Sequence, residues 1–205
     1  MKKILLFFVL GVLLASCSGK LTTSKAEKLI EEKLKQNPVE RYVTLKTGDS
    51  IEFYVSNGNK EKIEAYESLQ KEGFIEMSLV EEYESYYPNS MDYIYSIHLT
   101  DKGKKCVKNT QKSSDGKYTE NTVMSCSATL DKVDEIYLAP NINMAEATAT
   151  FKIEKTPFVV LEEDKYLFKD DIYSGVKIGF QKGEKNGWQI MGGWQVMGVK
   201  VWNIH

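Results

Sequence analysis

The fold prediction begins with the stretch ESLQKEGFI at residues 67–75, where a helical pattern gives way to a strand. Gly73 stands where a residue with positive φ commonly ends a helix. The apolar residues that recur at the spacing of one helix face are Ile63, Tyr66 and Leu69. The stretch therefore predicts a helix through about residues 60–72 that ends at Gly73 and leads directly into a strand.

A second stretch, YSIHLTDKG at residues 95–103, follows after a polar, tyrosine-rich segment. Together the two stretches resemble the recognition helix, wing and LT-x-x-G pattern of winged-helix proteins, over about residues 60–105. The resemblance implies a helix, a strand, a wing loop, a returning strand and a short helix at Thr100. Only the fold is carried over, because the DNA-binding role of that family needs a cytoplasmic location and a basic recognition helix. Residues 60–72 have no excess of bases, so we expect no nucleic-acid partner.

The chain on the N-terminal side of this stretch predicts one helix and a hairpin. Ser24 and Glu27 fit a capping box, and the apolar stripe that follows predicts a helix from about 25 to 36. Two short β-prone runs at 42–46 and 51–55 flank Thr47-Gly48-Asp49, which suits a tight turn.

The chain on the C-terminal side is β-rich. Residues 109–121 form a polar loop, and the Ala145-to-Ile153 run places alternate apolar residues on one strand face. Residues 182–187 should close a hairpin. We therefore predict the α+β class, with a helical, winged-helix-like subdomain at 24–108 and a small antiparallel β-rich subdomain at 109–205.

A tandem repeat, GWQIMG-GWQVMG, occupies residues 187–198. Because its period of six is even, both copies keep the same faces in one strand. We predict that Trp188, Trp194 and Trp202 lie on the buried face of a long strand that bends at Gly192-Gly193. The alternative is an exposed tryptophan platform for glycan.

The first seventeen residues predict where the protein works. A basic start and an apolar run at residues 4–14 are typical of an export signal, and the run is too short for a comfortable membrane span of about 20 residues. Leu14-Ala15-Ser16-Cys17 resembles the lipobox of bacterial lipoproteins. The resemblance implies a signal peptide at 1–16 and a lipidated tether at 17–23. It also implies that the thiol of Cys17 carries a diacylglycerol with fatty acids such as palmitate. The alternative is an ordinary secretory signal with a chance cysteine.

Lipidation would place the folded chain on a membrane. Two or more acyl chains hold a protein stably, whereas one binds marginally. Ser18 resembles the sorting pattern of outer-membrane lipoproteins, so we expect an exported protein of the cell envelope, on the periplasmic or surface side of the outer membrane if the bacterium is Gram-negative.

Three tyrosines of the polar wing segment are the candidate binding residues. Exposed aromatic rings stack on sugars or anchor protein partners. The candidates are Tyr83, Tyr86 and Tyr87. By contrast, Tyr93 and Tyr95 alternate with Ile97 on one strand face and are expected to be buried.

No motif specifies a reaction. The chain has only two histidines and lacks a P-loop, G-x-S-x-G or H-E-x-x-H, so we expect no catalytic residue, no cofactor and no metal site. The main hypothesis is a non-catalytic lipoprotein that binds or scaffolds an envelope protein or cell-wall glycan. The alternative is a hydrolase of an envelope polymer that uses acidic residues, which would need two carboxyl groups roughly 5–10 Å apart.

Cys106 and Cys126 are the cysteines that remain once Cys17 is acylated. Export would place them where disulfides persist. They lie at equal distances from Gly116, the turn residue of the intervening loop, so a hairpin with equal arms would bring them opposite each other. We therefore predict a Cys106–Cys126 disulfide. The alternative is two reduced cysteines.

Overall fold

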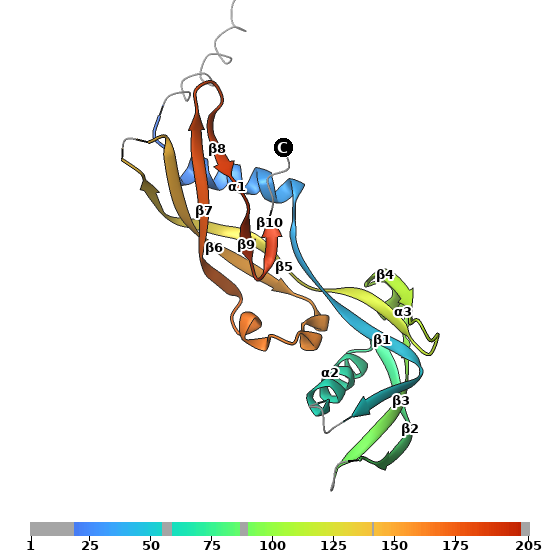
Figure 1. Cartoon of the computed structure of the whole chain (residues 1–205). Coiled ribbons are helices and arrows are strands. Elements are labelled where there is room, and N and C mark those ends of the chain that lie inside the picture. The colour runs from blue at the N-terminus through green and yellow to red at the C-terminus, as the bar shows by residue number, and fades with distance from the viewer. Residues whose placement is uncertain (1–18, 55–58, 87–89, 141, 202–205) are drawn as a thin grey trace, which may run out of the picture. The chain divides into compact units, whose positions relative to one another are not determined.

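The structure is a computed structural model that describes residues 19–54, 59–86, 90–140 and 142–201. Its elements, drawn in Figure 1, are α1 (Thr23–Gln36), β1 (Val39–Tyr54), α2 (Lys60–Lys71), β2 (Ile75–Glu84), β3 (Met91–Leu99), α3 (Asp101–Lys104), β4 (Val107–Lys112), β5 (Thr119–Leu138), β6 (Met144–Lys155), η2 (Pro157–Leu161), η3 (Lys165–Phe168), β7 (Ile172–Gly183), β8 (Gly187–Met191), β9 (Trp194–Val196) and β10 (Val199–Val201). Strands form 55% and helices 21% of the structure. The predicted α+β class is therefore wrong, and the fold is mostly antiparallel β.

The chain forms two compact units, and neither is one continuous segment. Unit 1 comprises Met1–Asn37, Leu130–Phe151 and Ser174–His205, and unit 2 comprises Pro38–Thr129 and Lys152–Tyr173. The hydrogen-bonded strand order is β2-β3-β1-β5-β6-β7-β8, while β4 pairs with β5 and β9 pairs with β10. The long strands β5 and β6 each run from one unit into the other. The units therefore alternate along the chain, whereas the sequence predicts one boundary at residue 109.

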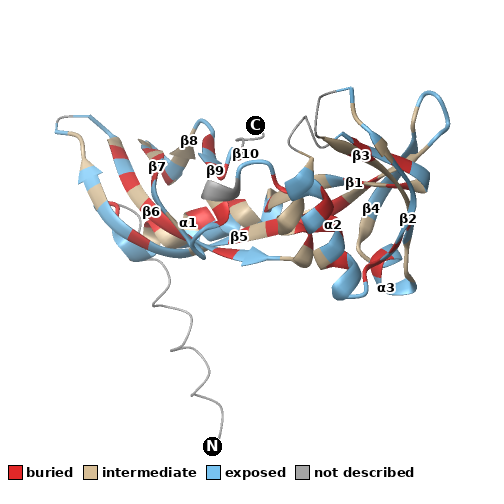
Figure 2. Cartoon of the chain, turned by 90° about the horizontal axis from the view of Figure 1, so that it is seen from below, coloured by how far each residue is buried: buried red, intermediate tan, exposed pale blue. Residues whose placement is uncertain are grey.

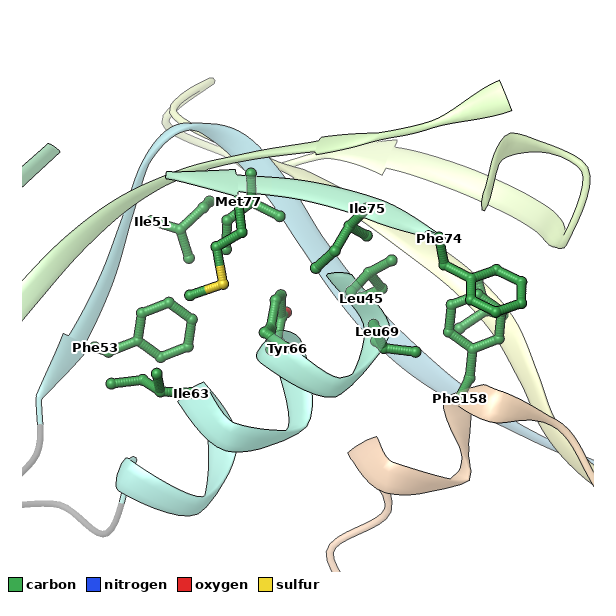
Figure 3. Close-up of a cluster of buried hydrophobic side chains, with 12 residues drawn as sticks. Leu45, Ile51, Phe53, Ile63, Tyr66, Leu69, Phe74, Ile75, Met77 and Phe158 are labelled. Atoms are coloured by element: carbon green, nitrogen blue, oxygen red, sulfur yellow. The ribbon is translucent and has the colours of Figure 1, made fainter. Parts of the chain in front are cut away.

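Unit 2 is built on a sheet whose one face is covered by α2. Figure 3 shows apolar side chains of β1 and β2 pointing toward α2 and the side chain of Phe158 beside Phe74. The rings of Phe53 and Tyr66 meet edge to face with centroids 5.4 Å apart. The buried members of this cluster are Leu45, Ile51, Phe53, Ile63, Tyr66, Leu69, Phe74, Ile75, Met77, Ile97, Val123 and Phe158. The helical spacing at residues 63–69 thus predicts the buried face of α2 correctly.

The hairpin predicted at residues 47–49 is absent. Instead β1 is one strand that pairs with β5 over Val39–Thr47 and with β3 from Gly48 onward, with an irregularity between Gly48 and Ile51. A Cβ atom at Gly48 would lie 3.1 Å from the carbonyl oxygen of Lys117, so glycine permits a close backbone approach there. The turn-like sequence therefore marks a bulge rather than a chain reversal.

The winged-helix prediction is wrong, although its local elements are present. The helix ends at Gly73, whose φ is 76°, and β2, β3 and α3 follow in the predicted order. However, β2 and β3 belong with β1 to a large eight-stranded antiparallel sheet, and this predominance of strand over helix conflicts with a winged-helix domain. The LT-x-x-G residues have local roles instead. The Thr100 hydroxyl caps α3 by accepting the N–H of Gly103 and donates to the carbonyl of Gly73 at 2.8 Å.

Unit 1 combines α1 with strands whose alternating burial is visible along β6 in Figure 2. The hydroxyl of Thr22, not that of the predicted Ser24, caps α1 by accepting the N–H of Lys25 at 3.3 Å. The carboxylate of Glu27 instead accepts the N–H of Val133. The predicted apolar face of β6 is buried, and its members are Ala145, Ala147, Ala149, Phe151 and Ile153.

The tandem repeat does not form one strand. Its first copy belongs to β8, which ends before Gly192-Gly193. The second copy forms β9, which pairs with β10 in a separate hairpin. Met197 and Gly198 have φ of 52° and 76°, which is the conformation of a tight hairpin turn. Trp188 and Trp194 are buried, as predicted, while Trp202 lies outside the described residues.

Candidate functional site

Three strands of unit 2 bring polar and aromatic residues into rows across the sheet. Asp92 of β3 is the partner of both Tyr54 on β1 and Tyr83 on β2. Two residues along the strands, Ile94 of β3 is the partner of both Glu52 and Glu81. Because side chains alternate along a strand and Phe53 contacts α2, both rows point to the opposite face.

This opposite face is strongly acidic. The segment of β1 from Gly48 to Tyr54, together with β2 and β3, contains no lysine or arginine. The carboxylates of these strands on the face away from α2 are Asp49, Glu52, Glu76, Glu81 and Asp92. The same face carries Tyr54, Tyr83, Ile94 and His98. We call the surface formed by these nine residues the acidic sheet face. The whole chain carries a formal charge of only −2, so the compensating positive charge lies elsewhere.

The carboxylates of the acidic sheet face raise the pKa values of its two tyrosines. The Tyr54 hydroxyl donates a hydrogen bond to Glu52, which together with partial burial raises the pKa of Tyr54 to about 12. Desolvation and then the charges of Glu52, Asp92 and Glu81 raise the pKa of Tyr83. Both phenols are therefore neutral donors at physiological pH. At the far end of the face, Nε2 of His98 lies 3.1 Å from Oδ1 of Asp49.

Burial divides the face into a core and a rim. Asp92 is only 4% exposed, whereas Tyr54 is 39% exposed and the side chains of Glu52 and Glu81 reach solvent. The arrangement places a sheltered carboxylate between two phenol rings, with further carboxylates around them. Aromatic rings with a charged rim are typical of surfaces that bind proteins.

The predicted tyrosines fall in three different settings. Tyr83 belongs to the acidic sheet face, Tyr86 is 96% exposed beyond the end of β2, and Tyr87 lies outside the described residues. Tyr93 and Tyr95 pack against the core on the α2 side but are only partly buried, whereas the sequence predicts that they are buried. The sequence does not single out Glu52, Tyr54 and Asp92, although the alternation in IEFY and VEEYE could have indicated a polar strand face.

The edge of this sheet is protected against further strand pairing. β2 is the last strand in the order of the sheet. Leu79 pairs with Tyr95 and Glu81 pairs with Ile94, so Val80 between them has no partner in the ladder and forms a bulge. The side-chain amide of Gln70 also donates to the carbonyl of Met77 at 2.9 Å. Bulges and covered backbone groups discourage the addition of a strand, so the face rather than the edge is the candidate binding surface.

The predicted Cys106–Cys126 disulfide is not formed. Cys106 and Cys126 are both free thiols, the first half-buried and the second buried. The β4–β5 ladder pairs Val107 with Val123, so the position opposite Cys106 is Met124, two residues short of Cys126. The ladder pairs Lys112 with Thr119, which is already one residue out of the equal-arm register, and the irregularity between Val107 and Asn109 adds a second residue of offset. Cys17, the predicted lipidation site, lies outside the described residues.

A buried polar network lies elsewhere in unit 2. Nε and Nη2 of Arg41 donate to the two carboxylate oxygens of Glu162 at 3.1 and 2.8 Å, and the Ser125 hydroxyl also donates to Glu162. The guanidinium of Arg41 lies over the ring of Phe168, with 5.3 Å between its carbon and the ring centroid. Ser125 is completely buried and cannot meet a substrate in this conformation. The network therefore stabilises the fold.

The described part of the chain contains neither a candidate metal cluster nor a helix that could span a membrane. Within it, no three His, Cys, Asp or Glu side chains cluster closely enough to hold a metal ion. None of its helices combines the length and the apolar character needed to span a membrane.

Comparisons with protein-family models, with curated proteins and with solved structures give no match to this chain.

Proposed function

We propose that this protein is an exported, lipid-anchored binding module that captures a basic protein surface through the acidic sheet face. The concentration of carboxylates on three adjacent strand segments without lysine or arginine carries the proposal. Lipidation at Cys17 is supported by the basic start, apolar run and LASC sequence of residues 1–17. In this role the protein is non-catalytic and holds its partner at a bacterial membrane.

The chemistry of the face favours a cationic protein as partner. A face lined by one sign of charge attracts the opposite sign and accelerates association. The rings of Tyr54 and Tyr83 offer apolar contact area together with hydroxyl donors, and both flank the sheltered carboxylate of Asp92. A lysine or arginine side chain of the partner can contact a ring and a carboxylate at once.

Site-specific photo-crosslinking in cells tests this function. A photoreactive amino acid replaces Ser78, which is exposed on the same face of β2, and adducts of the lipidated protein are collected. The variant E52K/E81K reverses two charges at exposed positions of the face. We expect the specific adduct to disappear in this variant. We also expect the purified partner to bind the unmodified protein about tenfold or more weakly as salt is raised.

A matched charge reversal provides the control. E64K/E67K makes the same charge change on exposed positions of α2, away from the acidic sheet face. This variant should retain the adduct. An adduct that survives E52K/E81K, or that both double variants lose equally, would show that the acidic sheet face is not the binding surface.

A further inference from the structure

We propose that one end of unit 1 rests on the lipid bilayer and inserts Tyr137 and Ile142 as a second membrane contact beside the lipid on Cys17. This proposal depends on the lipidation of Cys17 proposed above. We call the surface formed by Gly19, the described residues of the β5–β6 turn and the β7–β8 turn the anchor end.

The start of the described chain is fixed to unit 1. The carbonyl of Gly19 accepts a hydrogen bond from Nε1 of Trp188 at 3.1 Å, and the side chain of Leu21 is only 4% exposed. Gly19 lies two residues after Cys17, and two residues span at most about 7 Å when fully extended. An acylated Cys17 therefore holds the surface around Gly19 within about one nanometre of the bilayer.

The turns that surround Gly19 belong to two hairpins. Trp188 pairs with Lys182 across β7 and β8, next to the turn that joins these strands. The N–H of Lys182 in turn donates to the carbonyl of Asn143 at 2.8 Å, in the connection between β5 and β6. Figure 1 shows the start of the described chain and both turns at the same end of unit 1.

The β5–β6 turn exposes apolar side chains at this end. Ala139 donates its N–H to the carbonyl of Met144 and closes the turn that contains Ile142, which is 56% exposed. Tyr137, two residues before Ala139, is 65% exposed. A branched aliphatic side chain and a tyrosine suit the boundary between acyl chains and headgroups, where a ring can keep its hydroxyl in water.

The charges of the anchor end also suit a lipid surface. Lys20 and Lys185 are exposed there, and Lys182 is half-buried, against the single carboxylate of Glu184 in the β7–β8 turn. Lysines close to a bilayer are attracted to anionic headgroups. The short tether, the exposed apolar pair and the basic charge thus identify a lipid surface as the occupant of this end.

Lipid-contact fluorescence of the full-length lipidated protein tests the proposal. An environment-sensitive fluorescent amino acid replaces Ile142, and the protein is reconstituted into vesicles of phosphatidylcholine with a minority of phosphatidylglycerol. The control position is Asp131, an exposed residue on the same strand as Tyr137 and about 20 Å from it at roughly 3.3 Å per residue. Brominated acyl chains should quench the probe at position 142 at least about threefold more than the probe at position 131.

Vesicle flotation measured on the same samples separates the possible failures. Protein that floats with strong quenching at position 142 supports the inference. Protein that floats while brominated lipid quenches both positions equally overturns the second contact and leaves lipidation intact. Protein that does not float overturns lipidation at Cys17 and this inference with it.

Discussion

At the scale of single residues, the two tryptophans of the tandem repeat differ in one hydrogen bond. Trp188 and Trp194 are 6% and 5% exposed, so their rings are equally buried. The indole N–H of Trp188 donates to Gly19, whereas that of Trp194 has no hydrogen-bond partner among the described residues. A buried donor without a partner costs about 1–3 kcal/mol, which makes the pair a natural comparison.

We expect Trp188→Phe to be less stable than Trp194→Phe by about 1–3 kcal/mol. Both substitutions remove the same atoms from equally buried rings, but only the first loses a hydrogen bond, while the second removes an unpaired donor. The free energy of unfolding in urea measures the difference. Equal destabilisation of the two variants would show that the N–H of Trp194 has a partner in solution.

The two free thiols should differ in reactivity. Cys126 is completely buried, and desolvation raises its pKa, so little thiolate forms and reagents cannot reach it. Cys106 is half-buried, and its Sγ lies 3.6 Å from the carbonyl oxygen of Lys102. We expect iodoacetamide to modify Cys106 in the folded protein and Cys126 only after unfolding, as measured by peptide mass spectrometry.

The same experiment checks the absence of the disulfide. Without reductant, both thiols should react completely in urea. If neither reacts until reductant is added, a Cys106–Cys126 bond exists in the purified protein.

At the scale of elements, one ion pair fixes the η2–η3 segment to the sheet. Glu162 follows η2 directly and bonds Arg41 of β1 and Ser125 of β5. Removing its charge takes the paired carboxylate away from the partly buried guanidinium of Arg41. We expect Glu162→Gln to cost about 2–4 kcal/mol, at the lower side of values for buried pairs because Arg41 is 26% exposed.

Glu163→Gln is the matched control for this prediction. Glu163 is exposed, so the same substitution one residue later should change stability by less than about 0.5 kcal/mol. Urea unfolding gives both values, and trypsin cleavage at the exposed Lys169 should accelerate only in Glu162→Gln. Equal free energies of unfolding for the two variants would show that the ion pair does not stabilise the fold.

The local elements were predictable because their signals lie within a few residues. Helical spacing and Gly73 locate α2 and its end, and the turn at residues 183–187 follows from glycine and asparagine. The continuity of β1 was not predictable, because Thr47-Gly48-Asp49 suits a turn as well as a bulge. Only pairing with β5, whose partner residues lie about seventy or more positions later in the chain, decides between them.

The candidate site was predicted only in part for the same reason. Tyr83 stood out as an aromatic residue in a polar segment, but Glu52, Tyr54 and Asp92 become one surface only through the register of three strands. The disulfide prediction failed on register as well, since the turn between β4 and β5 and the irregularity in their ladder each shift the pairing by one residue away from Cys106–Cys126. Sequence composition does not reveal an offset of one or two residues in strand pairing.

At the scale of the whole molecule, the proposed lipidation of Cys17 is a prediction about where the protein is held. We expect Cys17→Ala to leave an unprocessed or soluble precursor, whereas the unmodified sequence partitions with membranes and incorporates a fatty-acid analogue. Membrane fractionation and metabolic labelling measure both properties. Equal labelling of the two forms would place the lipid on another residue or show that none is attached.

The division of unit 1 along the chain has a consequence for how the protein is made. Helix α1 is synthesised first, yet the strands that complete its unit, β7 to β10, are synthesised last. A growing chain therefore carries the apolar face of α1, with the buried side chains of Ala26 and Ile30, for more than a hundred residues before its permanent neighbours exist. Contacts so distant in sequence form slowly, and the newly made chain depends on being kept from aggregation until its last residues have emerged.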